Sequence, residues 1–225
     1  GCPAKKVVGG LSGSALMRDL DHALRMIEAV TAAVEVPVTL KTRLGWDDDS
    51  LNAPELARRA EEAGVQRIVI HGRTRCQFYK GSADWAAIAA IKDAVTIPVI
   101  ANGDIVDSVT ARRALDLSGA NGVMIGRGAQ GRPWVLAQIA AELHGGATVT
   151  APTGAALIQL VCDHYEAMLS FYGNDLGRRV SRKHLGWYMD DAQTDPVLRK
   201  AILTHINPRD VLRDLPDALT QKVAA

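Results

Sequence analysis

Four short apolar runs recur at nearly even spacing along the chain, and each run ends in polar or glycine-rich residues. They are Pro37–Arg43, Arg67–Arg73, Ile97–Asp104 and Gly122–Gly128. Helical patterns fill the gaps between them, and strands that alternate with helices predict parallel strands joined by right-handed crossovers. In a (β/α)8 barrel the active site is built at the carboxyl ends of the strands. The pattern therefore predicts an α/β fold whose functional groups stand at the strand ends.

Helical periodicity is clearest between the predicted strands and after the last of them. In the first part of the chain we expect helices over Ser14–Val34, Leu51–Ala63, Ser82–Val95, Asp107–Leu117 and Trp134–Leu143. The segment Asp47–Ser50 supplies capping side chains ahead of the second helix, and Ser82 or Asp84 caps the third. Gly119 ends the fourth helix.

A change of pattern marks a domain boundary. The segment Gly145–Thr148, followed by Pro152, has the composition of a linker. Beyond it the strand pattern does not recur, and the helical patterns are Thr153–Tyr172, Gly177–Met189, Pro196–His205 and Pro208–Leu219. We therefore predict the C-terminal part of a TIM (β/α)8 barrel over residues 1–146 and a small all-helical domain over residues 147–225.

Composition and charge narrow the class of protein. The 225 residues are 48% hydrophobic, which is typical of a globular protein. A formal net charge of +1 gives no overall attraction to nucleic acid, so an RNA partner would need a local basic patch. The three cysteines are odd in number and widely spaced, which argues against a disulfide framework or a zinc site and fits a reducing cytoplasm. We expect a cytoplasmic protein with no metal and no membrane association, because no apolar stretch reaches the roughly 18 residues that span a bilayer.

A phosphate site is indicated at the ends of the third and fourth predicted strands. Gly126 and Arg127 follow an apolar strand and precede a short helix, so backbone amides and a guanidinium could hold a phosphate together. Taken alone, these residues fit equally well a tight turn with a solvent-facing arginine. Asn102, Gly103 and Asp104 at the neighbouring strand end favour the phosphate site, because (β/α)8 barrels build it at two adjacent strand ends.

Lys41 and His71 are candidate ligand contacts at the first two strand ends. Lys41 lies inside an apolar strand, where a buried ammonium group needs an anionic or polar partner such as a reduced flavin ring. The alternative is a lysine whose stem reaches from the strand end to solvent. A lone histidine is usually structural, but the place of His71 at a strand end favours hydrogen bonding to a ring or a phosphate.

Cys2 is the candidate reacting group among the cysteines. A thiol held beside a substrate can act as an acid or, when ionised, as a nucleophile. Cys76, in the loop RTRCQFYKG, is either a second reactive thiol or, more simply, a free surface cysteine. Cys162 is interpreted as a small apolar helix residue.

A basic segment in the C-terminal part is a candidate RNA contact. It contains five basic side chains: Arg178, Arg179, Arg182, Lys183 and His184. Trp187 and Tyr188 follow, and cations beside aromatic rings suit an RNA backbone with unstacked bases. The alternative is a solvated helix face with its aromatic side chains in the core.

Six ordered motifs together resemble the tRNA-dihydrouridine synthase family, in particular its bacterial branch. They are GCPAKKV, PVTLKTRLGWDDDS, IVIHGRTRCQFYKGSADW, PVIANGDI, GVMIGRGAQGRPW and RKHLGWY. The resemblance covers essentially the whole chain. It implies FMN as cofactor, NADPH as reductant and a tRNA uridine as substrate, with hydride added at C6 of the flipped-out base and a proton at C5.

The resemblance also implies roles for residues at matching positions. Cys2 would donate the proton to C5, and Lys41 and His71 would contact the flavin. Asn102, Gly103 and Asp104 would form a loop on the phosphate side, with Gly126 and Arg127 as the phosphate clamp. Arg178, Arg179, Arg182, Lys183 and His184 would belong to the tRNA-binding face of the helical domain, and we expect a monomer.

The family pattern is not matched in one respect. Its first barrel strands, and the asparagine that precedes the GCP motif, have no counterpart in this sequence. We therefore expect an N-terminally truncated chain that by itself binds FMN weakly or not at all. Two alternatives stay open: an FMN-barrel dehydrogenase acting on a free pyrimidine or another small molecule, and a non-catalytic RNA-binding remnant of such an enzyme.

Overall fold

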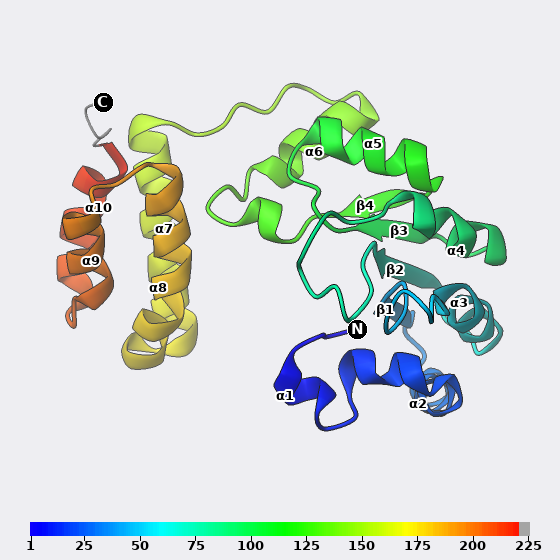
Figure 1. Ribbon diagram of the computed structural model, residues 1–225. Coiled ribbons are helices and arrows are strands. Elements are labelled where there is room, and N and C mark those ends of the chain that lie inside the picture. Colours follow the sequence, from blue (N-terminus) through cyan, green and yellow to red (C-terminus); the bar gives the residue numbers. More distant parts are fainter. Residues whose placement is uncertain (221–225) are drawn as a thin grey trace. The chain divides into compact units, whose positions relative to one another are not determined.

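The computed structural model describes residues 1–220 (Figure 1). The chain groups into two compact units, Gly1–Arg127 and the part from Gly128 onward. The first unit alternates strands with helices, whereas the described residues of the second unit form helices only. The α/β class predicted from the sequence is confirmed in the first unit.

A four-stranded parallel sheet is the framework of the first unit. Its strands are β1 (Thr39–Arg43), β2 (Arg67–His71), β3 (Val99–Asn102) and β4 (Gly122–Met124). They pair side by side in chain order, and every pairing is parallel. Each predicted strand is confirmed, but the last three end earlier than the apolar runs because the polar residues that follow leave the hydrogen-bonded ladder.

The register of the sheet separates a polar face from an apolar one. Arg43, His71, Asn102 and Met124 are direct neighbours across the four strands. Side chains alternate between the faces of a sheet, so this row shares one face with the row that begins at Lys41. The opposite face carries the fully buried Ile68, Ile70, Val99 and Ala101. Polar groups from separate strands are thereby collected on one face at the carboxyl ends of the strands.

Helices in the first unit pack beside the sheet and against one another (Figure 1). They are α1 (Lys5–Val8), η1 (Gly13–Arg18), α2 (Leu20–Ala33), α3 (Ala53–Glu62), η2 (Ala86–Ile88), α4 (Ala89–Ala94) and α5 (Ser108–Ser118). The start of α5 is fixed by a capping box between Asp107 and Thr110. It ends at Gly119, which has a φ of 61° as a left-handed cap.

Two expectations about these helices are wrong. The predicted helix over Ser14–Val34 is broken at Asp19, whose extended backbone and side-chain bond to the His22 amide start α2 as a new helix. The apolar spacing continues through the break, which is why periodicity alone missed it. The capping role given to Asp47–Ser50 also fails, since this segment closes its own turn and α3 begins later, without a side-chain cap.

The predicted helix over Ser82–Val95 is shorter in the structure. A turn of 3-10 helix, η2, precedes α4, and Asp84 accepts a hydrogen bond from the Ala87 amide at 2.9 Å. Capping near Asp84 is confirmed.

The second unit is a set of packed helices that follow the short turn η3 (Arg127–Ala129). They are α6 (Val135–His144), α7 (Gly154–Tyr172), α8 (Asn174–Asp191), α9 (Pro196–Thr204) and α10 (Pro208–Thr220). Helices α7 to α10 share a core that includes Tyr165, Met189, Ile202 and Leu215, all buried. The contacts assign α6 to this unit, whereas the sequence placed a boundary after residue 146. The domain assignment by function stays a prediction, and its last five residues, 221–225, lie outside the described part.

The hydroxyl of Tyr165 allows a test of the packing in this core. Tyr165 is fully buried, and its hydroxyl has no hydrogen-bond partner within residues 1–220. A buried unsatisfied hydroxyl costs free energy, so Tyr165→Phe should leave the free energy of unfolding unchanged or raise it by about 1 kcal/mol. The measurement is urea unfolding followed by circular dichroism.

Tyr188→Phe is the matched control. The Tyr188 hydroxyl lies 3.1 Å from Nδ1 of His164, so removing it should lower the free energy of unfolding by about 1 kcal/mol. A larger loss in Tyr165→Phe than in Tyr188→Phe would contradict the packing described.

Candidate active site

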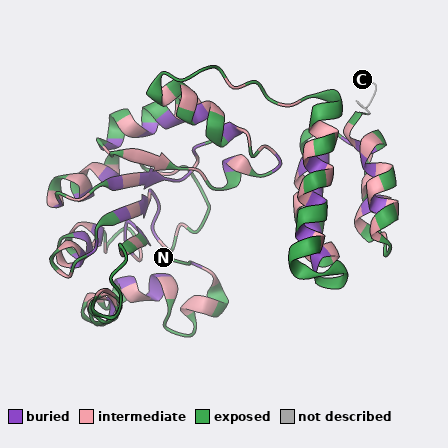
Figure 2. Ribbon diagram, turned by 180° about the vertical axis from the view of Figure 1, so that it is seen from behind, coloured by how far each residue is buried: buried purple, intermediate pink, exposed green. Residues whose placement is uncertain are grey.

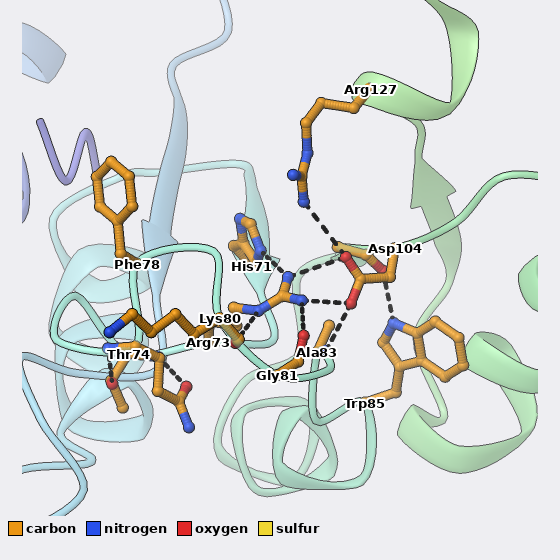
Figure 3. A network of polar contacts seen from close by, with 12 residues as sticks. His71, Arg73, Thr74, Phe78, Lys80, Gly81, Ala83, Trp85, Asp104 and Arg127 are labelled. Carbon is orange, nitrogen blue, oxygen red and sulfur yellow. Dashed lines mark hydrogen bonds and ion pairs between the residues drawn. The ribbon is translucent and has the colours of Figure 1, made fainter.

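A buried arginine organises the carboxyl end of the sheet (Figure 3). Arg73, two residues after β2, is only 1% exposed. Its guanidinium donates to both carboxylate oxygens of Asp104, at 3.0 and 2.5 Å. It also donates to the backbone oxygens of Lys80 at 3.1 Å and Gly81 at 2.7 Å, and it meets the His71 ring at 3.2 Å. All five N–H groups of the guanidinium therefore have partners.

These contacts define the protonation of His71. A guanidinium can only donate, so Nε2 of His71 must accept from Arg73 and the ring proton resides on Nδ1. Burial, followed by the positive charges of Arg43, Lys41 and Arg73, lowers the pKa of His71 from 6.5 to about 3. His71 is therefore a neutral ring with a defined tautomer at physiological pH.

The loop after β3 has a backbone that requires glycine. Gly103 has a φ of 113°, and a Cβ on it would lie 2.8 Å from the Ala83 side chain. Its carbonyl accepts from the Trp85 indole at 2.9 Å. The next residue, Asp104, also has a left-handed φ of 54°. Although burial alone raises it, the pKa of the Asp104 carboxyl falls below its usual value because Arg73 and the Ala83 amide donate hydrogen bonds.

Lys41 and Asn102 connect three strands of the polar face. The ammonium group of Lys41 on β1 donates to Oδ1 of Asn102 on β3 at 2.8 Å. The side-chain amide of Asn102 in turn donates to the backbone oxygen of Met124 on β4 at 2.8 Å. Burial, and then the charge of Arg43, lowers the pKa of Lys41. A further hydrogen-bond acceptor or anion near this ammonium group would relieve part of that cost.

The β4 end carries an accessible cation. Arg127 is 56% exposed, lies over the Tyr79 ring at 4.5 Å, and makes a long contact of 3.5 Å with Asp104. Gly126, next to it, has open space where a Cβ would stand and lacks a left-handed φ. Neither packing nor backbone conformation in the described residues requires glycine at 126. The backbone there is free for close approach by a ligand.

Two arginines that hold the site together were missed by the sequence analysis. Arg43 is 2% exposed and donates to the backbone oxygens of Thr74 and Phe78, so it anchors the loop after β2. Arg73 anchors the second half of the same loop. Arg43 is the last residue of β1 and Arg73 stands two residues after β2, and a cation at the end of an apolar run is the signal that could have identified them. Burial lowers the pKa of Arg43.

Cys2 lies near the end of β1. A Cβ on the adjacent Gly1 would stand 3.0 Å from the Lys41 oxygen and the Thr42 Cα, so this segment runs against β1. The backbone oxygen of Cys2 accepts from the Ser14 amide at 2.9 Å. Its thiol is free and exposed, as is that of Cys76, whereas Cys162 is partly buried. The structure thus brings Cys2, Lys41 and the other predicted first-unit residues to the end of the sheet where the strands have their carboxyl termini.

The basic side chains predicted for RNA contact all lie on α8 in the second unit. Arg178 and Arg179 both pair with Asp175, at 3.4 and 3.0 Å. None of the ion pairs formed within residues 1–220 involves Arg182 or Lys183. Burial, and then His164 and Lys183, lowers the pKa of His184, so it adds no charge at neutral pH. Trp187 packs edge-on to His184.

The described residues contain neither a metal-binding cluster nor a membrane-spanning helix. Within residues 1–220 no group of three or more His, Cys, Asp or Glu side chains is placed to bind a metal ion. None of the described helices has the length and apolar character needed to cross a membrane.

The neutral state of His71 is testable by NMR. A folded-state pKa near 3 predicts that the ring stays neutral with its proton on Nδ1 throughout pH 5–8. The imidazole of the unfolded chain takes up a second proton near pH 6.5, whereas that of the folded chain does so only near pH 3. The contribution of His71 to stability is therefore complete above about pH 6.5 and falls as the pH is lowered towards 3. Ring 15N shifts of the folded chain report the state directly.

The same chain in urea is the control, since its histidines should titrate near their ordinary pKa of about 6.5. A titration midpoint for His71 between pH 5 and 8 in the folded chain would contradict the Arg73 contact described.

Comparison with known proteins places the chain in a family. A family model described as dihydrouridine synthase matches residues 1–224. A probable tRNA-dihydrouridine synthase of Rhodobacter capsulatus is 61% identical over all of this chain and 69% of the relative. A probable tRNA-dihydrouridine synthase of Rickettsia conorii is 50% identical over all of this chain and 65% of the relative. The tRNA-dihydrouridine synthase B of Xanthomonas campestris is 47% identical over 97% of this chain and 67% of the relative.

The chain thus spans about two thirds of the length of these curated relatives. The family model and the identities extend over both compact units. The chain belongs to the dihydrouridine synthase family.

Proposed function

We propose that this chain forms the C-terminal part of an FMN-dependent tRNA-dihydrouridine synthase that reduces a tRNA uridine to 5,6-dihydrouridine with NADPH. In this proposal the four parallel strands belong to a (β/α)8 barrel, and the helices that follow form a tRNA-binding domain. Family membership supports the reaction class. The observation that carries the proposal for these residues is the polar row at the strand ends, where cations and a neutral histidine face one side of the sheet.

The donor set fits a flavin mononucleotide. Gly126 leaves the backbone open beside the exposed Arg127, a combination that suits a phosphate. Lys41, on the same face, offers a positive charge for the electron-rich edge of an isoalloxazine ring, and the Nδ1–H of His71 offers a donor. Bound there, FMN would supply a hydride. Asp104 could contact the cofactor only through its backbone, because its carboxylate is already paired with Arg73.

Arg127 has the accessible and weakly held charge that a phosphate clamp needs. Its contact with Asp104 is long, at 3.5 Å, while Tyr79 supports the guanidinium face. A phosphate could therefore replace the Asp104 contact without breaking a close pair. Arg73 has no comparable freedom, because all five of its N–H groups already have partners.

Cys2 supplies the acid that the reaction requires. The C5=C6 bond of uracil is conjugated with the C4 carbonyl, so addition of hydride at C6 leaves C5 as the carbon that must be protonated. The free thiol of Cys2 at the end of β1 is the candidate donor of this proton. Its backbone is held by Ser14, which keeps the segment against the strand.

The basic side chains of α8 favour RNA over a free pyrimidine as the substrate. Arg182 and Lys183 have no ion-pair partner in the part of the chain that the structure describes, and so their charge is available to phosphates. A barrel that reduces a free base has no need of such a face.

The cofactor assignment is tested by titrating the purified chain with FMN and following flavin fluorescence. We expect weak binding, which Arg127→Ala should weaken a further tenfold or more, because a charge-assisted hydrogen bond contributes about 1.5–3 kcal/mol. Gly126→Ala should weaken binding while leaving the melting temperature unchanged, since a Cβ at 126 meets no other atom.

Arg58→Ala is the matched control, because it removes the same charge from α3, where Arg58 pairs with Glu62. The Rhodobacter capsulatus relative provides a reference affinity in the same assay. Binding that is unaffected by both Arg127→Ala and Lys41→Met would contradict the assignment.

The acid role of Cys2 predicts a separation of two half-reactions. Cys2→Ala should lower dihydrouridine formation in an unmodified tRNA transcript about 100-fold or more, as expected for loss of a general acid. The rate of NADPH oxidation by the FMN-loaded protein should be unchanged, because that step does not need the proton at C5. Cys76→Ala, which removes an exposed thiol of the loop, is the control. Equal tRNA reduction by Cys2→Ala and the unaltered chain would exclude Cys2 as the donor.

A further inference from the structure

The turn between α7 and α8 presents an aromatic pair to solvent. Phe171 is 81% exposed and Tyr172 is 44% exposed, and their rings meet edge to face at 4.7 Å. Figure 2 shows this end of the two helices as exposed, in green, in contrast to the buried stretch in their middle. Large apolar side chains gathered at an exposed position are typical of interaction sites.

The reversal of the chain keeps these rings at the tip. Gly173 is the single residue between α7 and α8, with a φ of 75° that favours glycine. Neither Phe171 nor Tyr172 belongs to the core that α7 shares with α8 and α10. The two rings therefore do not contribute to the packing that stabilises the second unit.

A row of cations continues from the tip along α8. Arg179 lies three residues before Arg182 and four before Lys183, so these cations share one side of the helix. Leu176 is itself exposed at the tip. Arg179 shares the carboxylate of Asp175 with Arg178, so one negative charge serves two arginines. Arg182 and Lys183 both lie about one helical turn, or 5.4 Å, beyond Arg179.

We propose that the α7–α8 tip binds an unpaired nucleotide of the tRNA, with Phe171 and Tyr172 stacking on its base and Arg179, Arg182 and Lys183 contacting the adjacent phosphates. The inference rests on the proposed function and names the part of the RNA that the helical region recognises. Aromatic rings beside a cationic groove or stripe are the usual means of holding single-stranded nucleic acid. A, G, C and U all have a π-face, so the tip would select an exposed base rather than a sequence.

The test compares the affinity of the chain for an unmodified tRNA transcript, measured by fluorescence anisotropy. Replacing both rings, Phe171→Ala with Tyr172→Ala, should raise Kd about fivefold or more, because stacking contributes about 1–3 kcal/mol per base. The control replaces two exposed apolar residues outside the tip, Val109→Ala on α5 of the first unit with Val197→Ala on α9, which are 72% and 77% exposed. The control should leave Kd unchanged, and neither pair should alter the melting temperature.

Salt dependence separates the two halves of the surface. Arg182→Ala with Lys183→Ala should weaken binding and reduce the dependence of Kd on salt, because fewer counterions are released. The ring variant should weaken binding with an unchanged salt dependence. A duplex RNA without unpaired bases should bind the ring variant and the unaltered chain equally.

The outcomes distinguish this inference from the proposed function. If the unaltered chain binds tRNA and the ring variant binds equally well, the tip proposal is overturned and the proposed function stands. If the unaltered chain binds no tRNA, the RNA-binding part of the proposed function fails and takes the tip proposal with it. If sedimentation shows that the unaltered chain is an oligomer and the ring variant a monomer, while both bind tRNA with the same Kd, the tip is a protein interface and the proposal is overturned.

Discussion

The buried salt bridge between Arg73 and Asp104 fixes the geometry on which the candidate site depends. It joins the ends of two adjacent strands, and the same guanidinium holds the loop after β2 through two backbone oxygens. Removing one partner of a buried ion pair costs about 3–5 kcal/mol because the other charge is left uncompensated, although partial exposure of Asp104 reduces that figure. The tautomer of His71 depends on this pair as well. A change at Arg73 would therefore disturb the protonation of the site together with its shape.

The polar face carries more positive than negative charge. Lys41 and Arg43 lie on β1, and Arg73 follows β2. Asp104 is the acidic group that contacts Arg73 and Arg127. The pKa values of Lys41, Arg43 and His71 are all lowered, chiefly by burial. An anionic group bound at this face would relieve part of the repulsion between these cations. This charge distribution supports the proposal that an anionic cofactor binds here.

The sequence predicted the strands and several helix ends because their signals are local. Alternating apolar runs are sufficient to find β2, and Asp107 and Gly119 bound α5 by the chemistry of caps. What it missed depends on contacts between distant residues: Arg73 meets Asp104 across 31 residues, and Lys41 meets Asn102 across 61. Those pairs exist only once the register of the sheet is known. The break at Asp19 was missed for a different reason, since apolar periodicity there outlasts the helix itself.

Two glycines at neighbouring strand ends show how structure separates a folding requirement from a functional one. Both stand in motifs that the sequence analysis treated alike. Gly103 has a left-handed φ and no room for a Cβ, so the fold itself demands glycine there. Gly126 has an ordinary φ and open space, so neither the described packing nor the backbone conformation requires glycine there. The proposed phosphate contact therefore rests on the open backbone at Gly126 and the exposed Arg127, whereas the strained turn at Gly103 is already explained by the fold.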